Sequence, residues 1–434
     1  MVNTSVWTNW AGTASCRPAG VEHPRSEEDI VAALKRAGKA GERVKVVGTG
    51  HSFNDIACTG GRMLRLDGYD HVLEVDRERG LVTVEAGITV WNLAEELAKH
   101  GLAFQNLGDI GYQAIAGAVS TATHGTGAKL GNLATQIAAM RLILADGTAL
   151  ELSAESDPET FAAARVSLGA LGVISTITLQ CVPAFTLTCR EKPGKIDEVL
   201  DSFEDAAERH DHFWFWWFPH TDGCIVKTYD RIEEEAQPRG KVRAYVEDML
   251  LGNHLARVML RVGRARPSLI PRISRLAVST FSHEYSDRSD RVFTTPRLMR
   301  FAEMEYAVPR DRLVGAVREI RRVIDEGGFR ISFPVECRVV APDDIFLSPS
   351  YQRETGYIAV HVYQGMEHEP YFRAVEAIMR DIGGRPHWGK IHYQTHQTLR
   401  ELYPAWGRFA AVRSRLDPHG RFANAYLDRV LGEI

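Results

Sequence analysis

A glycine-rich turn that carries a histidine follows a short run of valines, in the segment Val46-Val47-Gly48-Thr49-Gly50-His51-Ser52-Phe53. Glycine lets the backbone adopt positive φ and approach a ligand closely. The exposed N–H groups of such a turn form a concavity that suits phosphate. The imidazole of His51 would then offer a nucleophilic nitrogen beside whatever is held there. A histidine in a turn is also common on protein surfaces, so the segment alone leaves both interpretations open.

A second segment, residues 114–127, is made almost entirely of small side chains: Ala-Ile-Ala-Gly-Ala-Val-Ser-Thr-Ala-Thr-His-Gly-Thr-Gly. Small side chains let a backbone lie against a flat ligand. The hydroxyl groups of Ser120 and Thr123 are available for a phosphate or a ribose. The segment therefore suits the wall of a large, flat binding site.

Charged side chains with spacing that suits catalysis occur near the C-terminus. Glu336 and Arg338, in Phe-Pro-Val-Glu-Cys-Arg, lie two residues apart, so on a strand they point to one face. They could serve a substrate site or form an ordinary surface ion pair. Lys390 ends the turn Arg-Pro-His-Trp-Gly-Lys at residues 385–390, in which His387 is expected to have a packing role. Lysine is normally solvated, but in a dry site its charge would stabilise a developing oxyanion.

These four segments, in this order, resemble the sugar-lactone oxidoreductases of the vanillyl-alcohol-oxidase type of flavoprotein. That group includes gulonolactone, arabinonolactone and galactonolactone oxidases or dehydrogenases, and the bacterial alditol oxidases. The resemblance covers nearly the whole chain and weakens between about residues 230 and 292. It implies an α+β, two-domain fold, with an FAD-binding domain at 1–182 and a substrate-binding cap domain at 183–434 built on an antiparallel sheet backed by helices. The ending Phe422-Ala423-Asn424-Ala425-Tyr426-Leu427 resembles the family segment that returns to the flavin.

The resemblance also implies FAD as the cofactor, attached covalently through a ring nitrogen of His51. It places Gly48, Thr49, Gly50 and Ser52 at the pyrophosphate. Further residues expected along the cofactor are Val47, Gly117, Ser120, Thr123, His124, Gly125 and Ile174. The six cysteines lack C-x-x-C spacing, so neither a structural metal nor a disulfide framework is expected.

Oxidation of a secondary alcohol by a flavin moves a hydride to the flavin and a proton away from the hydroxyl group. The resemblance implies that Arg338 and Lys390 share the proton relay while Glu336 orients them. His361 and Tyr363 alternate on one face of a predicted strand and are expected to contact the substrate. In alditol oxidases a small residue with a hydroxyl group stands at the position of Tyr363. The tyrosine here favours a ring lactone over an open-chain polyol as the substrate.

The predicted function is therefore FAD-dependent oxidation of an aldono-1,4-lactone, of the L-gulono-1,4-lactone type, to a 2-keto lactone that tautomerises to an ascorbate-like ene-diol. The alternative is an alditol or carbohydrate oxidase of the same family, including one in a biosynthetic pathway. A third interpretation is a flavin-carrying or sugar-binding protein without turnover, against which the set Glu336, Arg338 and Lys390 argues. The electron acceptor is expected to be O2, an artificial dye or a cytochrome.

Hydrophobic periodicity predicts the elements that position these residues. A helix begins after Ser26, and a strand at 44–47 leads into the glycine-rich turn. The aromatic strand at 212–219 either fills a core or lends one ring to a sugar. Two hairpins are expected, at 72–75 with 81–87 and at 137–144 with 149–152, then a strand at 171–179. The second part should hold strands at 301–309, 329–340 and 357–363, and helices at 311–325 and 371–380.

Composition excludes several classes of protein. At 434 residues, with 44% hydrophobic and 25% charged residues, the chain is typical of a globular protein of two domains. A net charge of −4 gives no polycationic surface for nucleic acid. No signal peptide is recognisable and no apolar run approaches the roughly 18 residues that span a bilayer, so a cytoplasmic location is expected. The arginine-rich stretch 257–275 is predicted to be a solvated face of an amphipathic helix rather than a membrane or nucleic-acid contact.

Overall fold

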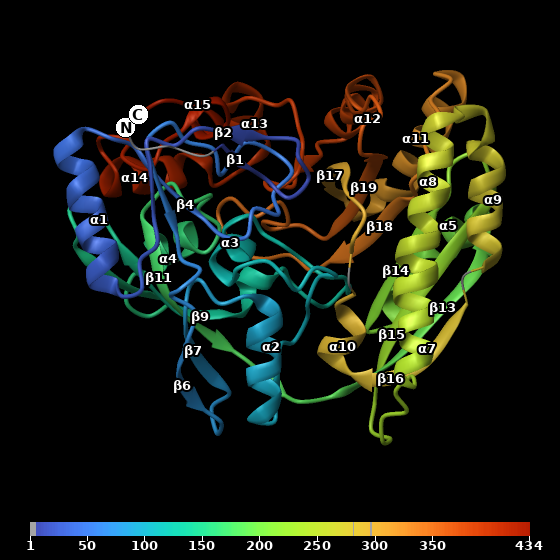
Figure 1. Cartoon of the computed structure of the whole chain (residues 1–434), viewed down its shortest axis with the longest axis horizontal. Coiled ribbons are helices and arrows are strands. Elements are labelled where there is room, and N and C mark those ends of the chain that lie inside the picture. The colour runs from blue at the N-terminus through green and yellow to red at the C-terminus, as the bar shows by residue number, and fades with distance from the viewer. Residues whose placement is uncertain (1–5, 281, 296) are drawn as a thin grey trace.

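The computed structural model describes residues 6–280, 282–295 and 297–434. Its elements form two halves that lie side by side (Figure 1). The N-terminal strands and helices, coloured blue to cyan, share one half with the red C-terminal helices. A large sheet, coloured green to orange, and its helices form the other half. Among the described residues, no helix is both long enough and apolar enough to cross a lipid bilayer.

A small parallel sheet positions the glycine-rich turn. Its strands are β3 (Gly20–Glu22), β4 (Val44–Val47) and β5 (Arg62–Arg65), with β5 in the centre. Helix α1 (Glu27–Ala40) crosses between β3 and β4, and the Ser26 side chain caps it by accepting from the Asp29 N–H as predicted. Strand β4 ends at Val47, so the turn that follows lies at the carboxyl end of a parallel strand, where α/β proteins commonly bind ligands.

An antiparallel sheet of five strands completes the first half, in the order β10-β9-β11-β7-β6. Both predicted hairpins are confirmed, because β6 pairs with β7 and β9 pairs with β10 in antiparallel register. Its strands are β6 (Val72–Asp76), β7 (Leu81–Glu85), β9 (Ile137–Ile143), β10 (Ala149–Ser153) and β11 (Val173–Gln180). Around it lie β1 (Trp7–Thr8), β2 (Ser15–Cys16), β8 (Leu102–Ala103), β12 (Val182–Pro183), α2 (Val90–Lys99), α3 (Ile115–Ser120), η1 (Leu133–Gln136) and α4 (Pro158–Ala164).

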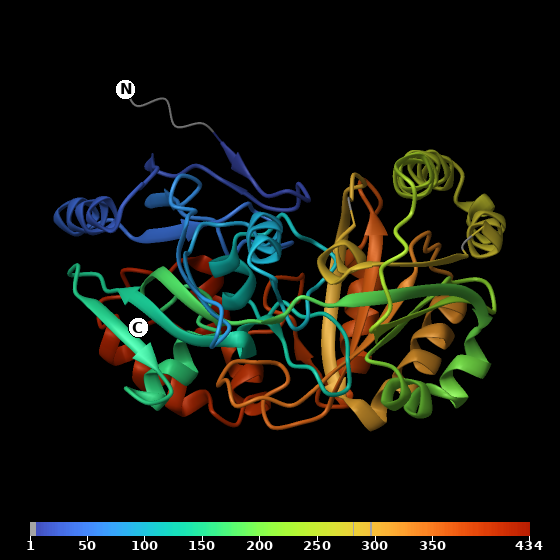
Figure 2. The same cartoon turned by 90° about the horizontal axis from the view of Figure 1, so that it is seen from below.

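The second half is built on an eight-stranded antiparallel sheet, in the order β16-β13-β15-β14-β18-β19-β17-β20. Its strands are β13 (Thr186–Lys195), β14 (His212–Trp217), β15 (Gly223–Ile232), β16 (His283–Arg288), β17 (Phe301–Pro309), β18 (Val335–Val340), β19 (Thr355–Tyr363) and β20 (Arg385–Pro386). Its helices are α5 (Ile196–Asp201), α6 (Phe203–Arg209), α10 (Ser289–Phe293), η4 (Arg310–Arg312), α11 (Leu313–Glu326) and α12 (Glu369–Asp381). Figure 2 shows this sheet edge-on, with α5 and α11 on the face turned away from the first half.

The aromatic strand β14 is buried along its whole length, and its rings divide between the two faces of the sheet. Phe213, Phe215 and Trp217 belong to the core formed with the helices of this half. Trp214 and Trp216 alternate with them and point to the opposite face, where Trp216 lines a cavity. The strand expected at 329–340 begins only at Val335. Proline has no N–H to donate to a neighbouring strand. Pro334 is therefore the last residue of the irregular segment before β18.

The C-terminal helices return to the first half and support the glycine-rich turn. They are α13 (His396–Leu402), α14 (Trp406–Leu416) and α15 (Ala425–Leu431). The Val44 N–H donates to the Arg421 carbonyl at 2.7 Å. The Asn424 side chain donates to the carbonyls of Ile56 at 2.9 Å and Cys58 at 2.8 Å. Trp388, which precedes these helices in the sequence, also packs within the core of the first half. The predicted domain boundary at 182/183 stays a prediction.

Candidate active site

The turn after β4 requires its glycines. Gly50 has φ +76°, in the left-handed region, and a Cβ there would lie 3.2 Å from the Trp7 ring. A Cβ on Gly48 would lie 3.0 Å from the Cβ of Ala114, which belongs to the small-residue segment. The Trp10 N–H donates to the Gly50 carbonyl at 2.8 Å. The two segments predicted to form one binding site therefore contact each other directly.

A first cavity lies between this turn and helix α3 and takes in most of the residues expected along the cofactor. Gly169 and Gly172 lie at the same cavity, next to the predicted residue Ile174. The predicted residues that line it are Val47, Gly48, Thr49, Gly50, His51, Ser52, Gly117, Ser120 and Ile174. Thr123 and His124 line a second cavity instead, and the two linings share Gln113. Gly125 lines neither; a Cβ there would lie 2.3 Å from the Leu107 carbonyl oxygen, so packing accounts for this glycine.

The residues of the first cavity fit a dinucleotide with a flat ring. Nothing lies within 4 Å of a Cβ built on Gly117, so the α3 backbone is open to a ligand. At the adjoining second cavity, the buried hydroxyl of Thr123 has no hydrogen-bond partner among the described residues, as expected for a group that faces a ligand. The Gly48-Thr49-Gly50 turn lines the first cavity, and backbone N–H groups of such a turn suit a pyrophosphate.

His51 lies at the wall of this cavity as a neutral imidazole. Its ring stacks on Trp10 with centroids 5.3 Å apart. Burial and the positive charge of Lys390 lower the pKa of His51 to about 4. At neutral pH the ring therefore keeps a free lone pair, which a nucleophile requires.

The second cavity, of about 490 Å³, brings together the three predicted catalytic residues and one of the two predicted substrate contacts. Glu336, Arg338, His361 and Lys390 all line it. Tyr363 does not; it packs against Leu260 and Met299, farther along β19. The opposite wall is apolar and comes mainly from three further helices of the second half, η2 (Tyr245–Leu255), α8 (Ala256–Ala265) and α9 (Ile270–Thr280). They contribute Leu251, Leu255, Ala256, Met259, Leu260, Ile273 and Ala277.

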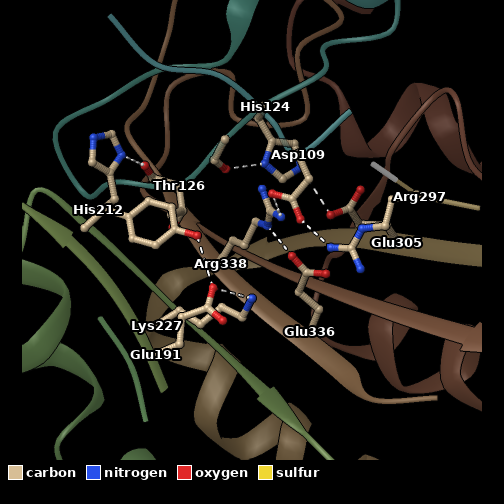
Figure 3. A network of polar contacts seen from close by, with 12 residues as sticks. Asp109, His124, Thr126, Glu191, His212, Lys227, Arg297, Glu305, Glu336 and Arg338 are labelled. Atoms are coloured by element: carbon tan, nitrogen blue, oxygen red, sulfur yellow. Dashed lines mark hydrogen bonds and ion pairs between the residues drawn. The ribbon is translucent and has the colours of Figure 1, made fainter. Parts of the chain in front are cut away.

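Arg338 is buried between two carboxylates that come from different halves (Figure 3). Its Nη2 donates to Asp109 Oδ1 at 2.7 Å, and its Nε donates to Glu336 Oε1. Arg297 Nη2 donates to the second Asp109 oxygen at 3.0 Å. Burial alone would raise the pKa of Asp109, but Arg338 and Arg297 hold it well below its usual range. No described hydrogen bond uses Arg338 Nη1, which leaves that nitrogen for a substrate.

Lys390 and His361 share one buried carboxylate, Glu303. Lys390 Nζ lies 2.6 Å from Glu303 Oε2, and His361 Nε2 lies 3.5 Å from Oε1. Burial opposes ionisation of Glu303, yet Lys390 and His361 lower its pKa to about 2. His361 Nδ1 donates to the Pro334 carbonyl at 3.0 Å. Both ring nitrogens of His361 face oxygen atoms, and Glu303 outweighs burial in raising the pKa of His361.

A third group, His124, Glu305 and His387, has the spacing of a metal site, with ligand atoms within 4.8 Å of one another. Its hydrogen bonds argue otherwise. His387 Nδ1 accepts from the Gly389 N–H at 3.0 Å, so the proton of this neutral ring sits on Nε2, the nitrogen that a metal would need. Burial lowers the pKa of His387 to about 3. His124 Nε2 lies 3.2 Å from Glu305, and the three residues form a hydrogen-bonding cluster that packs the Lys390 turn.

Sequence analysis missed Asp109, Glu303 and Glu305. The two glutamates carried a signal, because they alternate on one face of the otherwise apolar strand β17, and both line the cavity. Asp109 carried none, since it lies in an irregular loop and its role depends on Arg338, 229 positions later. Carboxylates are seldom buried without a partner, so two acids on a buried strand indicate nearby cations.

Comparisons with known proteins agree with this geometry. Residues 177–430 match the family model of D-arabinono-1,4-lactone oxidase, and residues 18–153 match an FAD-binding domain. L-gulono-1,4-lactone dehydrogenase from Mycobacterium tuberculosis is 46% identical over 428 residues, which cover 98% of this chain and 99% of the relative. L-gulonolactone oxidase from Bos taurus is 39% identical over 430 residues, 97% of each chain.

Among solved structures, a solvent-stable cholesterol oxidase matches with a TM-score of 0.82 over 99% of this chain and 98% of that one. Their identity is 18%, so this likeness shows the fold alone. It confirms the predicted α+β fold with an FAD-binding domain and an antiparallel sheet, and the FAD-binding match confirms the cofactor class. The family match and the full-length relatives together show that this chain belongs to the D-arabinono-1,4-lactone oxidase family, a group of FAD-dependent oxidoreductases of the vanillyl-alcohol-oxidase type.

Proposed function

We propose that this enzyme oxidises a secondary alcohol of an aldono-1,4-lactone, of the L-gulono-1,4-lactone type, to the 2-keto lactone, which tautomerises to an ascorbate-like ene-diol. The observation that carries the proposal is the set of three basic side chains, Arg338, Lys390 and His361, that carboxylates hold around one cavity. This cavity adjoins the one that fits FAD. Relatives of 46% and 39% identity carry the names of a gulonolactone dehydrogenase and a gulonolactone oxidase.

The charged residues divide the work on the hydroxyl group. When bound, FAD supplies the acceptor for the hydride that leaves the carbinol carbon. Arg338 stays protonated, and its unused Nη1 donates to the hydroxyl oxygen and stabilises the charge that develops there. Lys390 Nζ, held by Glu303 Oε2 at 2.6 Å, relays the hydroxyl proton away from the substrate toward solvent. Glu336 and Asp109 fix the guanidinium from two sides.

An alditol or carbohydrate oxidase is the less favoured activity. The family match over residues 177–430 is to a lactone oxidase. Tyr363, which had been expected to contact the substrate, lies outside the lining of the cavity. Tyr363 therefore gives no reason to exclude an open-chain substrate. Phe333, which stacks on Tyr363 with centroids 6.3 Å apart, lines the cavity in its place.

Substrate choice can be tested by anaerobic reduction. An open-chain polyol must immobilise several rotors on binding, whereas a ring lactone is rigid, so L-gulono-1,4-lactone should bleach the yellow enzyme at least about tenfold faster than sorbitol at equal concentration. The bleaching rate in a stopped-flow spectrophotometer gives the comparison. Equal or faster bleaching by sorbitol would make the enzyme an alditol oxidase.

We also propose that the flavin is bound covalently through His51. The neutral imidazole at the cavity wall supports this attachment. Acid precipitation of the native enzyme should leave the yellow colour with the protein, and mass spectrometry of tryptic peptides should find it on the peptide that contains His51. H51A should release all its flavin to the supernatant. H71A is the matched control, because the His71 side chain is 73% exposed, and it should keep its colour. Release of colour from the native enzyme would contradict the proposal.

Arg338 and Lys390 should both act in flavin reduction. K390A and R338A should each reduce anaerobically about a hundredfold more slowly or worse, because each loses one positioned catalytic group. Their flavin content, measured from the absorbance ratio, should match the native enzyme. R373A removes an arginine whose side chain is 56% exposed and should leave the rate unchanged. A variant at either site that reduces at the native rate would remove that residue from the mechanism.

For the electron acceptor we propose O2. The small side chains of Ala116, Gly117 and Ala118 line the cofactor cavity, which supports an open path to the ring. Mixing reduced enzyme with air-saturated buffer should restore the yellow colour within about a second, at the pace of a typical turnover, with hydrogen peroxide formed in step. Reoxidation over minutes, beside rapid reduction of a dye or a cytochrome, would identify a dehydrogenase instead.

A further inference from the structure

Strand β4 carries one charged side chain, Lys45, which is buried beside the first cavity. Lys45 is 3% exposed and is among the residues that line this cavity. Its Nζ donates to the Leu168 carbonyl at 3.0 Å. Leu168 and Gly169 line the same cavity, and a Cβ on Gly169 would lie 3.6 Å from the Lys45 Nζ. The charged end of Lys45 therefore lies where β4 and the turn at residues 168–169 meet at the cavity wall.

This lysine lacks the acidic partner that a buried cation normally has. Lysine is seldom fully buried unless an acid pairs with it, and the one hydrogen bond of Lys45 among the described residues is to a carbonyl. An ammonium group carries three N–H donors, so two remain after the bond to Leu168. A buried donor without an acceptor costs free energy, and we therefore expect a ligand to supply the missing acceptor.

The charges around Lys45 favour a ligand that is an anion. Burial and the positive charge of Arg413 lower the pKa of Lys45 to about 7, against an opposing effect of Asp417. Arg413 is itself buried, and its Nε and Nη2 have no hydrogen-bond partner among the described residues. Asp417 already accepts from the backbone N–H groups of Arg421 and Phe422. Two buried basic side chains thus face one acid, and a negative ligand would correct this imbalance.

The turn that contacts Lys45 has a strained backbone. Leu168 has φ +56°, in the left-handed region that residues other than glycine seldom adopt. The Leu168 N–H donates to the Ser120 carbonyl at 3.1 Å, so the turn is fixed to α3 as well as to β4. Strained residues of this kind cluster at ligand sites. The turn therefore holds Lys45 beside the helix that carries Gly117 and Ser120, two residues of the cofactor cavity.

The place of Lys45 in the cavity indicates which part of FAD it meets. His51, the proposed attachment point of the flavin ring, lies near Lys390 of the second cavity. Lys45 lines the first cavity alone and precedes the glycine-rich turn that suits the pyrophosphate. We propose that Lys45 Nζ binds a phosphate or ribose oxygen of the adenosine monophosphate half of FAD, while the Leu168 carbonyl holds the amine in place.

Titration of full-length H51A apoprotein with flavins tests this role, because the flavin then exchanges freely. FMN is FAD without the adenosine monophosphate half, so the loss of a contact to that half must weaken FAD binding more than FMN binding. H51A/K45M should bind FAD at least about tenfold more weakly than H51A, since it loses a charge-assisted hydrogen bond. Its affinity for FMN should change by less than about threefold. Quenching of flavin fluorescence gives both dissociation constants.

H51A/K39M is the matched control, because Lys39 at the end of α1 is exposed; it should bind both flavins like H51A. H51A/K45Q keeps a neutral donor in the buried site and answers the question if the methionine variant does not fold. It should lose at least about threefold in FAD affinity, because a neutral hydrogen bond is about half as strong as a charged one.

FAD affinity that stays at the H51A value in the folded Lys45 variant would overturn the proposal. Equal losses of FAD and FMN affinity would overturn it as well, because Lys45 would then support the fold alone. Neither titration uses a sugar, so the result is independent of the proposed lactone oxidation.

Discussion

The ion pair between Asp109 and Arg338 is the contact on which the active site depends. It joins a loop of the first half to a strand of the second across 2.7 Å; the Arg338 side chain is buried, and that of Asp109 is 18% exposed. A charge left without its partner in such a place costs several kcal/mol. The halves therefore fit together in the one arrangement that pairs these charges. The His124–Glu305 pair spans the same interface and sets the same requirement.

Pairing and burial also shift the pKa values of the site's histidines in opposite directions. Glu303 pairs with Lys390 and raises the pKa of His361, while burial lowers the pKa of His387 and of His51. A charged partner decides the direction for one imidazole, and burial decides it for the other two. A site organised in this way spends little free energy on reorganisation during the reaction. The carboxylates that neutralise the cations also make the cavity suitable for an uncharged sugar.

Local patterns in the sequence predicted the local structure well. The hairpins, the capped helix α1, the glycine-rich turn and the alternation of Glu336 with Arg338 all depend on neighbours in sequence, and the structure has each of them. Alternation predicts the face of a strand but not how far along it a cavity extends. His361 and Tyr363 share a face of β19, yet only His361 lines the cavity, because Tyr363 lies under α8 with Leu260. The partnership of Asp109 with Arg338 had no local signature, since it exists only after the halves meet.

The C-terminal residues support the cofactor cavity. Arg421 pairs with the first residue of β4, and Asn424 holds the loop that follows the glycine-rich turn. A fragment that lacks residues 421–424 would lack both supports. The wall of the cofactor cavity that the glycine-rich turn forms therefore depends on contacts between residues almost four hundred positions apart in the sequence.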